Sequence, residues 1–214
     1  MRLFVIAFSL FLLTPLNLAS AHPHVWTDMT IKILFDKTGK VTGLHQTWLF
    51  DDYYTAYAIE GVGVGGDGKP DPKKLNEIMQ VNMEHLKEYG YFTEARNKDK
   101  ILKLKPITDK STRMKGARLE MSFTTPFETP VSPSNDSFSY AIFDPTYYVE
   151  MLHAEVESPV ILSEAPTGCH YKLIPPNPDP SAVAQAAMLD ASMRGETGLG
   201  SFFAERVYLT CPEE

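Results

Sequence analysis

Alternating apolar and polar residues mark the first two strands of this chain. Between residues 25 and 35, apolar side chains such as Met29 and Ile31 occupy odd positions, and polar side chains occupy most even positions. A period of two is typical of a strand with one buried face. Residues 36–39 are turn formers, and residues 41–50 resume a strand-like pattern. The pattern therefore predicts a β-hairpin from residue 25 to residue 50.

Apolar spacing and turn signals predict the remaining elements. Apolar residues recur at helical spacing from Lys73 to Tyr89, and Asp179 followed by Pro180 is typical of a helix start. We expect a short helix over 53–60, helices over 73–89 and 181–193, a hairpin of strands 91–105 and 113–125, strands over 138–142 and 147–153, and a last strand within 202–209. The predicted fold class is α+β, mostly antiparallel β with a few helices, in a single domain.

The first 21 residues have the pattern of a secretory signal peptide. Arg2 is followed by an apolar run from Leu3 to Leu13, and the segment closes on Ala19-Ser20-Ala21, a small-x-small cleavage pattern. A run of about eleven residues spans only ~16 Å as a helix, which is about half the thickness of a bilayer core. We therefore expect a leader over residues 1–21 and a soluble, periplasmic, β-rich domain over residues 22–214.

The charge balance bears on the kind of partner. The chain carries 27 acidic and 20 basic residues, for a net charge of −7, and the leader contains only one of these charges, at Arg2. Such a surface repels nucleic acid and anionic lipid headgroups. It attracts cations, although solubility is the commoner consequence of a net negative charge. We therefore expect no nucleic-acid partner.

Cys169 and Cys211 are the two cysteines of the chain. In an oxidising compartment, an even and sparse cysteine count usually means a structural disulfide. The alternative is a thiolate metal ligand, with His170 beside Cys169. Because the sequence contains no C-x-x-C spacing, the disulfide is favoured.

Cleavage after Ala21 would leave His22-Pro23-His24 at the start of the mature chain. The free α-amine, the His22 ring and the His24 ring then form a three-nitrogen set suited to copper, nickel or zinc. Alternation places both rings on one side of an extended chain. Pro23 has no amide proton, so a site that uses the deprotonated amide of the second residue is excluded. The competing interpretation is that both histidines are ordinary polar residues at a frayed terminus.

The hairpin register nominates a carboxylate ligand. With a two-residue turn near Thr38, paired positions sum to 75 or 77, so His24 faces Asp51 or Tyr53. Both registers place Asp51 on the polar face with His24. Asp28 lies four residues along the strand from His24, ~13 Å away, and is the reserve carboxylate. The candidate metal ligands are therefore His22, His24, Asp51 and Asp28.

Other motifs that carry chemistry are weak or missing from the sequence. Gly61, Gly63 and Gly66 match G-x-G-x-x-G, but no hydrophobic strand precedes them and two prolines follow, so a loop is the better interpretation. Neither a G-x-S-x-G nucleophile elbow nor an H-E-x-x-H zinc helix occurs. We therefore expect no enzymatic activity. Structural or surface roles are the default for Asp144, His85, His153 and His170.

The mature chain resembles an uncharacterised periplasmic family described as a component of ABC-type transport systems. The resemblance rests on His22-Pro23-His24-Val25-Trp26 with Asp28, on Asp51 after an aromatic strand, on Phe143-Asp144-Pro145 with Tyr147, and on Gly200-Ser201-Phe202-Phe203-Ala204 running to Cys211. Members are often encoded beside, or fused to, membrane proteins of the nickel/cobalt-exporter type, and some are tied to zinc. The resemblance implies a soluble metal-handling partner of a membrane transporter.

Taken together, residues and resemblance predict a periplasmic accessory protein that binds a divalent transition metal, zinc, nickel or copper, and serves a membrane metal transporter. Two alternatives stay open. The amine and two histidines would also suit a copper brace in an oxidative enzyme. A metal-free adaptor domain that docks a membrane protein is the third hypothesis.

Overall fold

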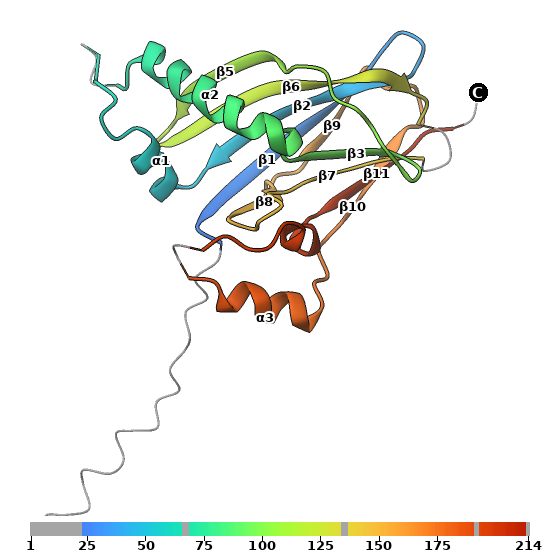
Figure 1. Cartoon of the computed structure of the whole chain (residues 1–214). Coiled ribbons are helices and arrows are strands. Elements are labelled where there is room, and N and C mark those ends of the chain that lie inside the picture. The colour runs from blue at the N-terminus through green and yellow to red at the C-terminus, as the bar shows by residue number, and fades with distance from the viewer. Residues whose placement is uncertain (1–22, 66–68, 134–136, 191–192, 213–214) are drawn as a thin grey trace, which may run out of the picture.

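Two β-sheets and three α-helices make up the part of the chain that the computed structural model describes, residues 23–65, 69–133, 137–190 and 193–212 (Figure 1). The first sheet has six strands in the order β5-β6-β2-β1-β8, with β9 paired to β1. Its strands are β1 (Val25–Phe35), β2 (Val41–Phe50), β5 (Thr108–Lys115), β6 (Arg118–Val131), β8 (Val149–His153) and β9 (Val160–Ser163).

The second sheet has five strands in the order β10-β11-β7-β3-β4. They are β3 (Thr93–Asn97), β4 (Lys100–Ile101), β7 (Phe138–Ile142), β10 (His170–Ile174) and β11 (Arg206–Thr210). The helices are α1 (Asp52–Ala58), α2 (Pro72–Leu86) and α3 (Pro180–Met188). The α+β class, with mostly antiparallel strands, is confirmed.

The β1–β2 hairpin follows one of the two expected registers. Paired residue numbers sum to 77 from Thr27↔Phe50 to Leu34↔Gly43. Odd residues of β1 and even residues of β2 therefore share one face, and those side chains are buried except for Thr42. The bounds of both strands agree with the expectation from alternation.

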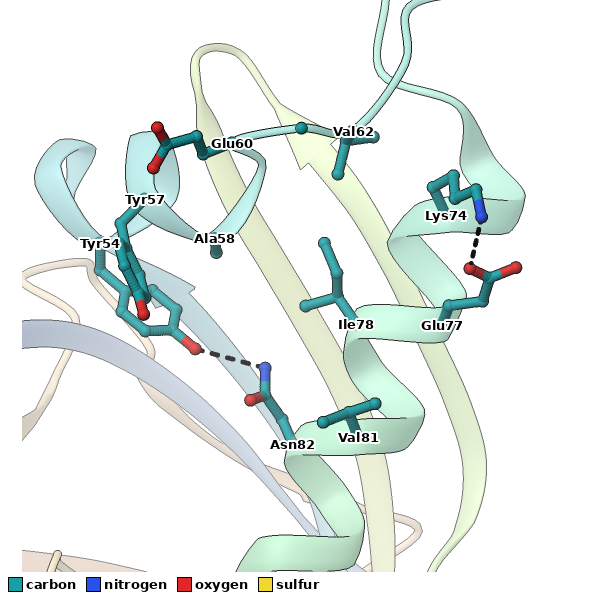
Figure 2. Close-up of a pocket in the computed structure, with 11 residues that line it drawn as sticks. Tyr54, Tyr57, Ala58, Glu60, Val62, Lys74, Glu77, Ile78, Val81 and Asn82 are labelled. Carbon is teal, nitrogen blue, oxygen red and sulfur yellow. Dashed lines mark hydrogen bonds and ion pairs between the residues drawn. The ribbon is translucent and has the colours of Figure 1, made fainter.

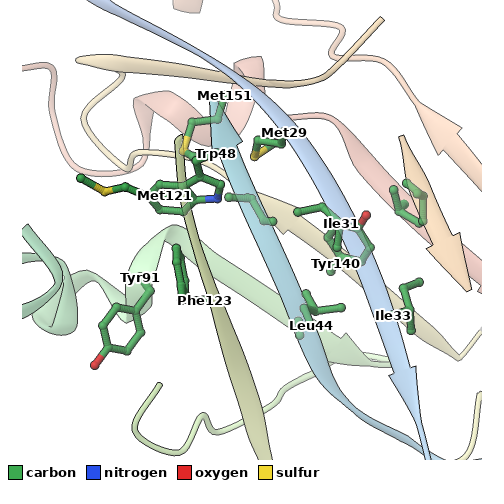
Figure 3. Close-up of a cluster of buried hydrophobic side chains, with 14 of the residues drawn as sticks. Met29, Ile31, Ile33, Leu44, Trp48, Tyr91, Met121, Phe123, Tyr140 and Met151 are labelled. Atoms are coloured by element: carbon green, nitrogen blue, oxygen red, sulfur yellow. The ribbon is translucent and has the colours of Figure 1, made fainter. Parts of the chain in front are cut away.

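A single cluster of buried side chains joins the two sheets and α2. Figure 3 shows Ile31 of β1 and Leu44 of β2 in this cluster with Tyr140 of the second sheet. The helix α2 contributes Met79, whose Sδ accepts a hydrogen bond from the Thr112 hydroxyl of β5 at 2.9 Å. The core is thus built from the inner faces of both sheets and one face of α2.

His153 makes a polar link between the sheets. Its Nδ1 lies 2.7 Å from Glu205 Oε2, and its Nε2 lies 3.0 Å from the Tyr140 hydroxyl of β7. Burial raises the pKa of the Tyr140 hydroxyl well above its ordinary value, so this group stays protonated. The expectation that His153 is a hydrogen-bonded, structural histidine is confirmed.

The expected hairpin of strands 91–105 and 113–125 is wrong. The turn lies later, at Gly116, whose φ of 63° suits a residue without a side chain, and it joins β5 to β6 in the first sheet. Tyr91 and Phe92 also adopt positive φ. The chain then runs into β3, which pairs with β7 in the second sheet. Residues 91–105 and 113–125 therefore belong to different sheets.

Three further expectations need smaller corrections. The strand expected from residue 147 begins at Val149, and the last strand begins at Arg206 after a 3₁₀-helix, Leu199–Phe203. The helix α3 begins at Pro180 with Asp179 as its N-cap, as expected, but ends at Met188 because Leu189 is extended. Strands β8 and β9 both run parallel to β1, which local patterning does not reveal.

The expected disulfide between Cys169 and Cys211 is present. It joins the loop before β10 to the residue after β11. None of the helices in the described residues is long and apolar enough to cross a membrane. The expected leader over residues 1–21 and its cleavage point lie outside the described residues.

We predict that replacing both cysteines by serine destabilises the mature domain. The bridge closes a loop with a sequence separation of 42, which corresponds to about 4 kcal/mol in the loop-entropy model. Urea unfolding of the oxidised wild type and of the Cys169→Ser/Cys211→Ser variant measures the difference. A loss below about 1 kcal/mol would contradict a stabilising role.

Candidate functional site

The backbone at His24 is tied to the edge of the first sheet. Its N–H donates to the Tyr148 carbonyl at 2.9 Å, and parallel pairing begins one residue later with Val25↔Val149. The His24 and Tyr148 rings lie with centroids 5.0 Å apart. The start of the expected mature chain is therefore held beside β8 at this point, and His22 itself lies outside the described residues.

Asp51 ties the end of β2 to the start of β1. Its Oδ1 accepts the Tyr54 N–H at 2.8 Å and caps α1, while its Oδ2 accepts the Trp26 N–H at 2.8 Å. Its own N–H donates to the Trp26 carbonyl at 2.9 Å. Asp51 therefore lies opposite Trp26, an exposed residue two positions from His24. Diagonal neighbours on one face of an antiparallel pair are typically ~7–8 Å apart.

Asp28 of β1 is held by an arginine of β6, which lies on the other side of β2 in the sheet. Its Oδ2 forms an ion pair with Arg118 Nη2 at 2.8 Å. The same guanidinium donates to the Leu49 and Phe50 carbonyls of β2. The Asp28 carboxylate is therefore already neutralised, and of the two candidate carboxylates Asp51 is the one nearer to His24 along the strand.

Among the residues that the structure describes, no three histidine, cysteine, aspartate or glutamate side chains come together as a metal-binding group. Of the four candidate ligands, His24, Asp28 and Asp51 lie within the described residues. A three- or four-ligand site at this edge therefore needs donors from the residues before Pro23, which are His22 and the α-amine.

The Asp144 turn supports the same edge of the sheet. The buried Asp144 carboxylate accepts four hydrogen bonds, two at each oxygen. Its donors are the Thr146 N–H and hydroxyl, the Tyr148 N–H and the Val149 N–H. These bonds fix the backbone of Tyr148, whose carbonyl accepts the His24 N–H. Asp144 thus acts through structure, as expected.

The C-terminal segment clamps this turn. The Tyr147 and Phe203 rings stack with centroids 3.9 Å apart, and the Gly200 N–H donates to the Pro145 carbonyl at 3.2 Å. A Cβ at Gly200 would overlap the Asp144 backbone oxygen. Two motifs far apart in the sequence, residues 143–147 and 200–204, therefore form one packed unit behind His24.

A groove lies between α1 and α2 (Figure 2). Its volume is about 440 Å³, and the Tyr54 hydroxyl accepts a 3.3 Å hydrogen bond from Asn82 across it. Tyr57 and Val81 are 75% and 56% exposed along its walls. This exposed apolar surface is suited to a protein partner more than to an ion.

Comparison with known proteins places the chain in a family. A family model described as "Protein of unknown function (DUF1007)" matches residues 7–211. This chain belongs to the DUF1007 family. A protein of Haemophilus influenzae (strain ATCC 51907 / DSM 11121 / KW20 / Rd), described as "Uncharacterized protein", is 29% identical over 193 residues, which cover 89% of this chain and 91% of that protein. No solved structure matches.

Sequence reasoning did not nominate two residues of this DUF1007 chain that shape the site. Tyr148 accepts the His24 N–H and packs against its ring, and its only sequence signal is its place beside the Asp144-Pro145 motif. Arg118 neutralises Asp28, and no local pattern marks it because the contact joins two strands. Both are found only once the strand order is known.

We predict that Gly200→Ala destabilises the domain by about 1–3 kcal/mol, the usual cost of forcing extra volume into a packed site. The reason is the overlap of a Cβ with the Asp144 carbonyl. Gly63→Ala is the matched control, because a Cβ there meets nothing within 4 Å. Thermal and urea unfolding of both variants provides the comparison, and equal stabilities would refute the clamp.

We also predict that Asp51→Ala costs more stability than Asp179→Ala. Both variants lose a helix N-cap, which typically costs about 1 kcal/mol. Only Asp51→Ala also leaves the Trp26 N–H without its carboxylate partner, which adds about 1 kcal/mol. Urea unfolding of the metal-free protein measures both losses. An Asp51→Ala loss no larger than that of Asp179→Ala would contradict the strand-tying role.

Proposed function

We propose that the mature chain is an exported, periplasmic accessory protein that binds a divalent transition metal at its N-terminal end and serves a membrane metal transporter of the nickel/cobalt-exporter type. The proposed ligands are the α-amine, His22, His24 and Asp51, with Asp28 in reserve. The observation that carries the proposal is the anchoring of the His24 backbone at the sheet edge, two residues from Trp26, whose N–H is held by the Asp51 carboxylate.

Anchoring of the ligand residues favours metal binding, because less conformational entropy is then lost when the ion binds. The His24 backbone is bonded to Tyr148, and the Asp51 carboxylate is oriented by two backbone N–H groups. Each Asp51 oxygen has a further lone pair, and metal-ligating carboxylates are commonly oriented by such hydrogen bonds. Only the short segment before Pro23 would need to close over the ion.

The proposed donor atoms suit a metal ion that is intermediate between hard and soft. Both cysteines of the chain lie in the disulfide, so neither thiolate can bind the ion, and the alternative of a thiolate ligand beside His170 is excluded in the oxidised protein. Imidazole, amine and carboxylate donors suit zinc, nickel and copper(II). When bound, the ion would be cargo held in a site open to solvent on one side.

The service to a transporter rests on the resemblance in residues 22–28, 143–147 and 200–204. The groove between α1 and α2 favours the third hypothesis, a metal-free adaptor, because its exposed Tyr57 and Val81 form an apolar surface. The two functions differ in one simple property. An adaptor needs no metal to engage its partner.

We predict that metal affinity depends on the free terminus. Calorimetric titration with zinc, nickel and copper would compare the native His22 terminus, the same protein with an added N-terminal Gly-Ser, and His24→Ala, with His170→Ala as a control on an exposed histidine. The native form and the control should bind most tightly. Because these ligands must be deprotonated, affinity should fall as pH drops from about 8 to about 6.

Two outcomes would change the assignment. Equal affinity in the native and Gly-Ser forms, with loss only in His24→Ala, would remove the amine and leave a side-chain site. Failure of the native form to bind any of the three ions would contradict the proposal and favour the adaptor.

A further inference from the structure

A polar groove, separate from the groove between α1 and α2, lies on the outer face of the second sheet. Its volume is about 440 Å³. Cationic and hydroxyl side chains predominate in its lining, which includes Arg96, Lys98, Ser137, Ser139, Arg206 and Tyr208. Asp99 is the one carboxylate in that lining. Such a concentration of positive charge is unexpected on a chain with a net charge of −7.

The strand register explains why this surface is hollow. Ser139 of the central strand β7 lies between Arg96 of β3 and Tyr208 of β11. The next pair on the same face places Ala141 between Glu94 and Arg206. Small residues therefore form the floor along β7, and long side chains of the flanking strands form the walls. Ser137 and Ser139 are each only 6% exposed at this floor.

Glu94 holds the two guanidinium groups in place. Its Oε1 accepts from Arg96 Nε at 2.8 Å and from Arg206 Nη2 at 2.6 Å. The hydrogen bond from Arg96 is the main cause that lowers the pKa of Glu94, so this carboxylate stays ionised at neutral pH. Orienting arginines through a carboxylate behind them is a common way to prepare a binding site.

These contacts leave donors unused. Arg206 Nη1 is buried and has no hydrogen-bond partner within the described part of the chain. Buried polar atoms of this kind are rare and call for an explanation such as a bound ion or water. A purely structural Arg–Glu–Arg bridge accounts for one donor of each guanidinium. It does not account for Lys98 or for the hydroxyl-lined floor.

We propose that this groove binds a phosphate-type oxyanion carried by a small molecule. Arg96 and Arg206 supply charge-assisted donors to the oxygens, Lys98 adds a third positive charge, and the Ser139 floor sets the depth of the site. Glu94 and Asp99 leave a local charge of about +1, so hydrogen bonding contributes more than long-range attraction. The negative surface as a whole favours a freely diffusing ligand over an anionic membrane.

The test uses the intact mature protein with inorganic phosphate as the probe. Calorimetry and NMR chemical-shift changes measure the affinity of binding. Lys98→Gln should weaken binding roughly five- to tenfold through the loss of a charge-assisted contact. Asp99→Asn should tighten binding, because it removes the repelling carboxylate. Ser139→Leu should abolish binding by filling the floor. Lys73→Gln removes the same charge from exposed α2 and should leave affinity unchanged.

A vesicle-binding experiment distinguishes a free phosphate ligand from a lipid headgroup. Binding to inorganic phosphate without retention on vesicles of equal parts phosphatidylglycerol and phosphatidylcholine supports a free ligand. Retention on those vesicles that inorganic phosphate reverses supports the same groove with a lipid headgroup. No phosphate binding by a folded wild type, or equal effects of Lys98→Gln and Lys73→Gln, would overturn the proposal. Neither result bears on metal binding at His24.

Discussion

The register of β1 against β2 is the constraint on which the rest of this structure depends. It sends Ile31 and Ile33 into the shared core while Trp26 stays exposed on the opposite face. A slip of one residue would exchange the two faces along the whole strand. Because β1 also pairs with β8 and β9, such a slip would disrupt three strand pairs at once. The same register places Asp51 opposite Trp26, at the edge where the mature chain is expected to begin.

Two carboxylates near that edge accept hydrogen bonds from backbone N–H groups. Asp51 binds the N–H groups of Trp26 and Tyr54, and Asp144 binds those of Thr146, Tyr148 and Val149. Asp51 joins the start of β1 to the start of α1, whereas Asp144 orders the turn that leads into β8. The result is that the backbone at His24 has a position determined by tertiary contacts, which would suit the proposed metal site. The same contacts explain why two distant motifs occur together in one chain.

The sequence pattern predicted those elements that depend on neighbouring residues in the chain. Alternation located β1 and β2, and Asp179 with Pro180 located the start of α3. The hairpin of strands 91–105 and 113–125 failed because the turn at Gly116 joins β5 to β6, while β3 pairs with β7 in the other sheet. The parallel partners of β1 could not be predicted, since pairing between strands over a hundred residues apart leaves no periodic signal.

At the candidate site, too, features set by the local sequence could be predicted and those set by tertiary contacts could not. Register arithmetic placed Asp51 on the polar face, yet its hydrogen bond from the Tyr54 N–H depends on the position of α1 and could not be foreseen. The Arg118 partner of Asp28 comes from a strand whose neighbours were not known. Likewise, the oxyanion groove combines β3, β7 and β11, three strands that become adjacent only in the folded sheet. Sequence reasoning therefore placed Asp51 on the correct face of the hairpin, but the contacts of both candidate carboxylates became visible only in the structure.

Anomalous diffraction at the metal edge, from crystals of the mature protein loaded with zinc, tests the central claim most directly. We predict one strong peak within about 2.0–2.2 Å of a His24 ring nitrogen, with His22 and the α-amine beside it and an Asp51 oxygen at similar distance. A peak at another place in the fold, such as near Asp28 and Arg118, or a His24 ring that binds no metal at full zinc occupancy, would contradict the assignment.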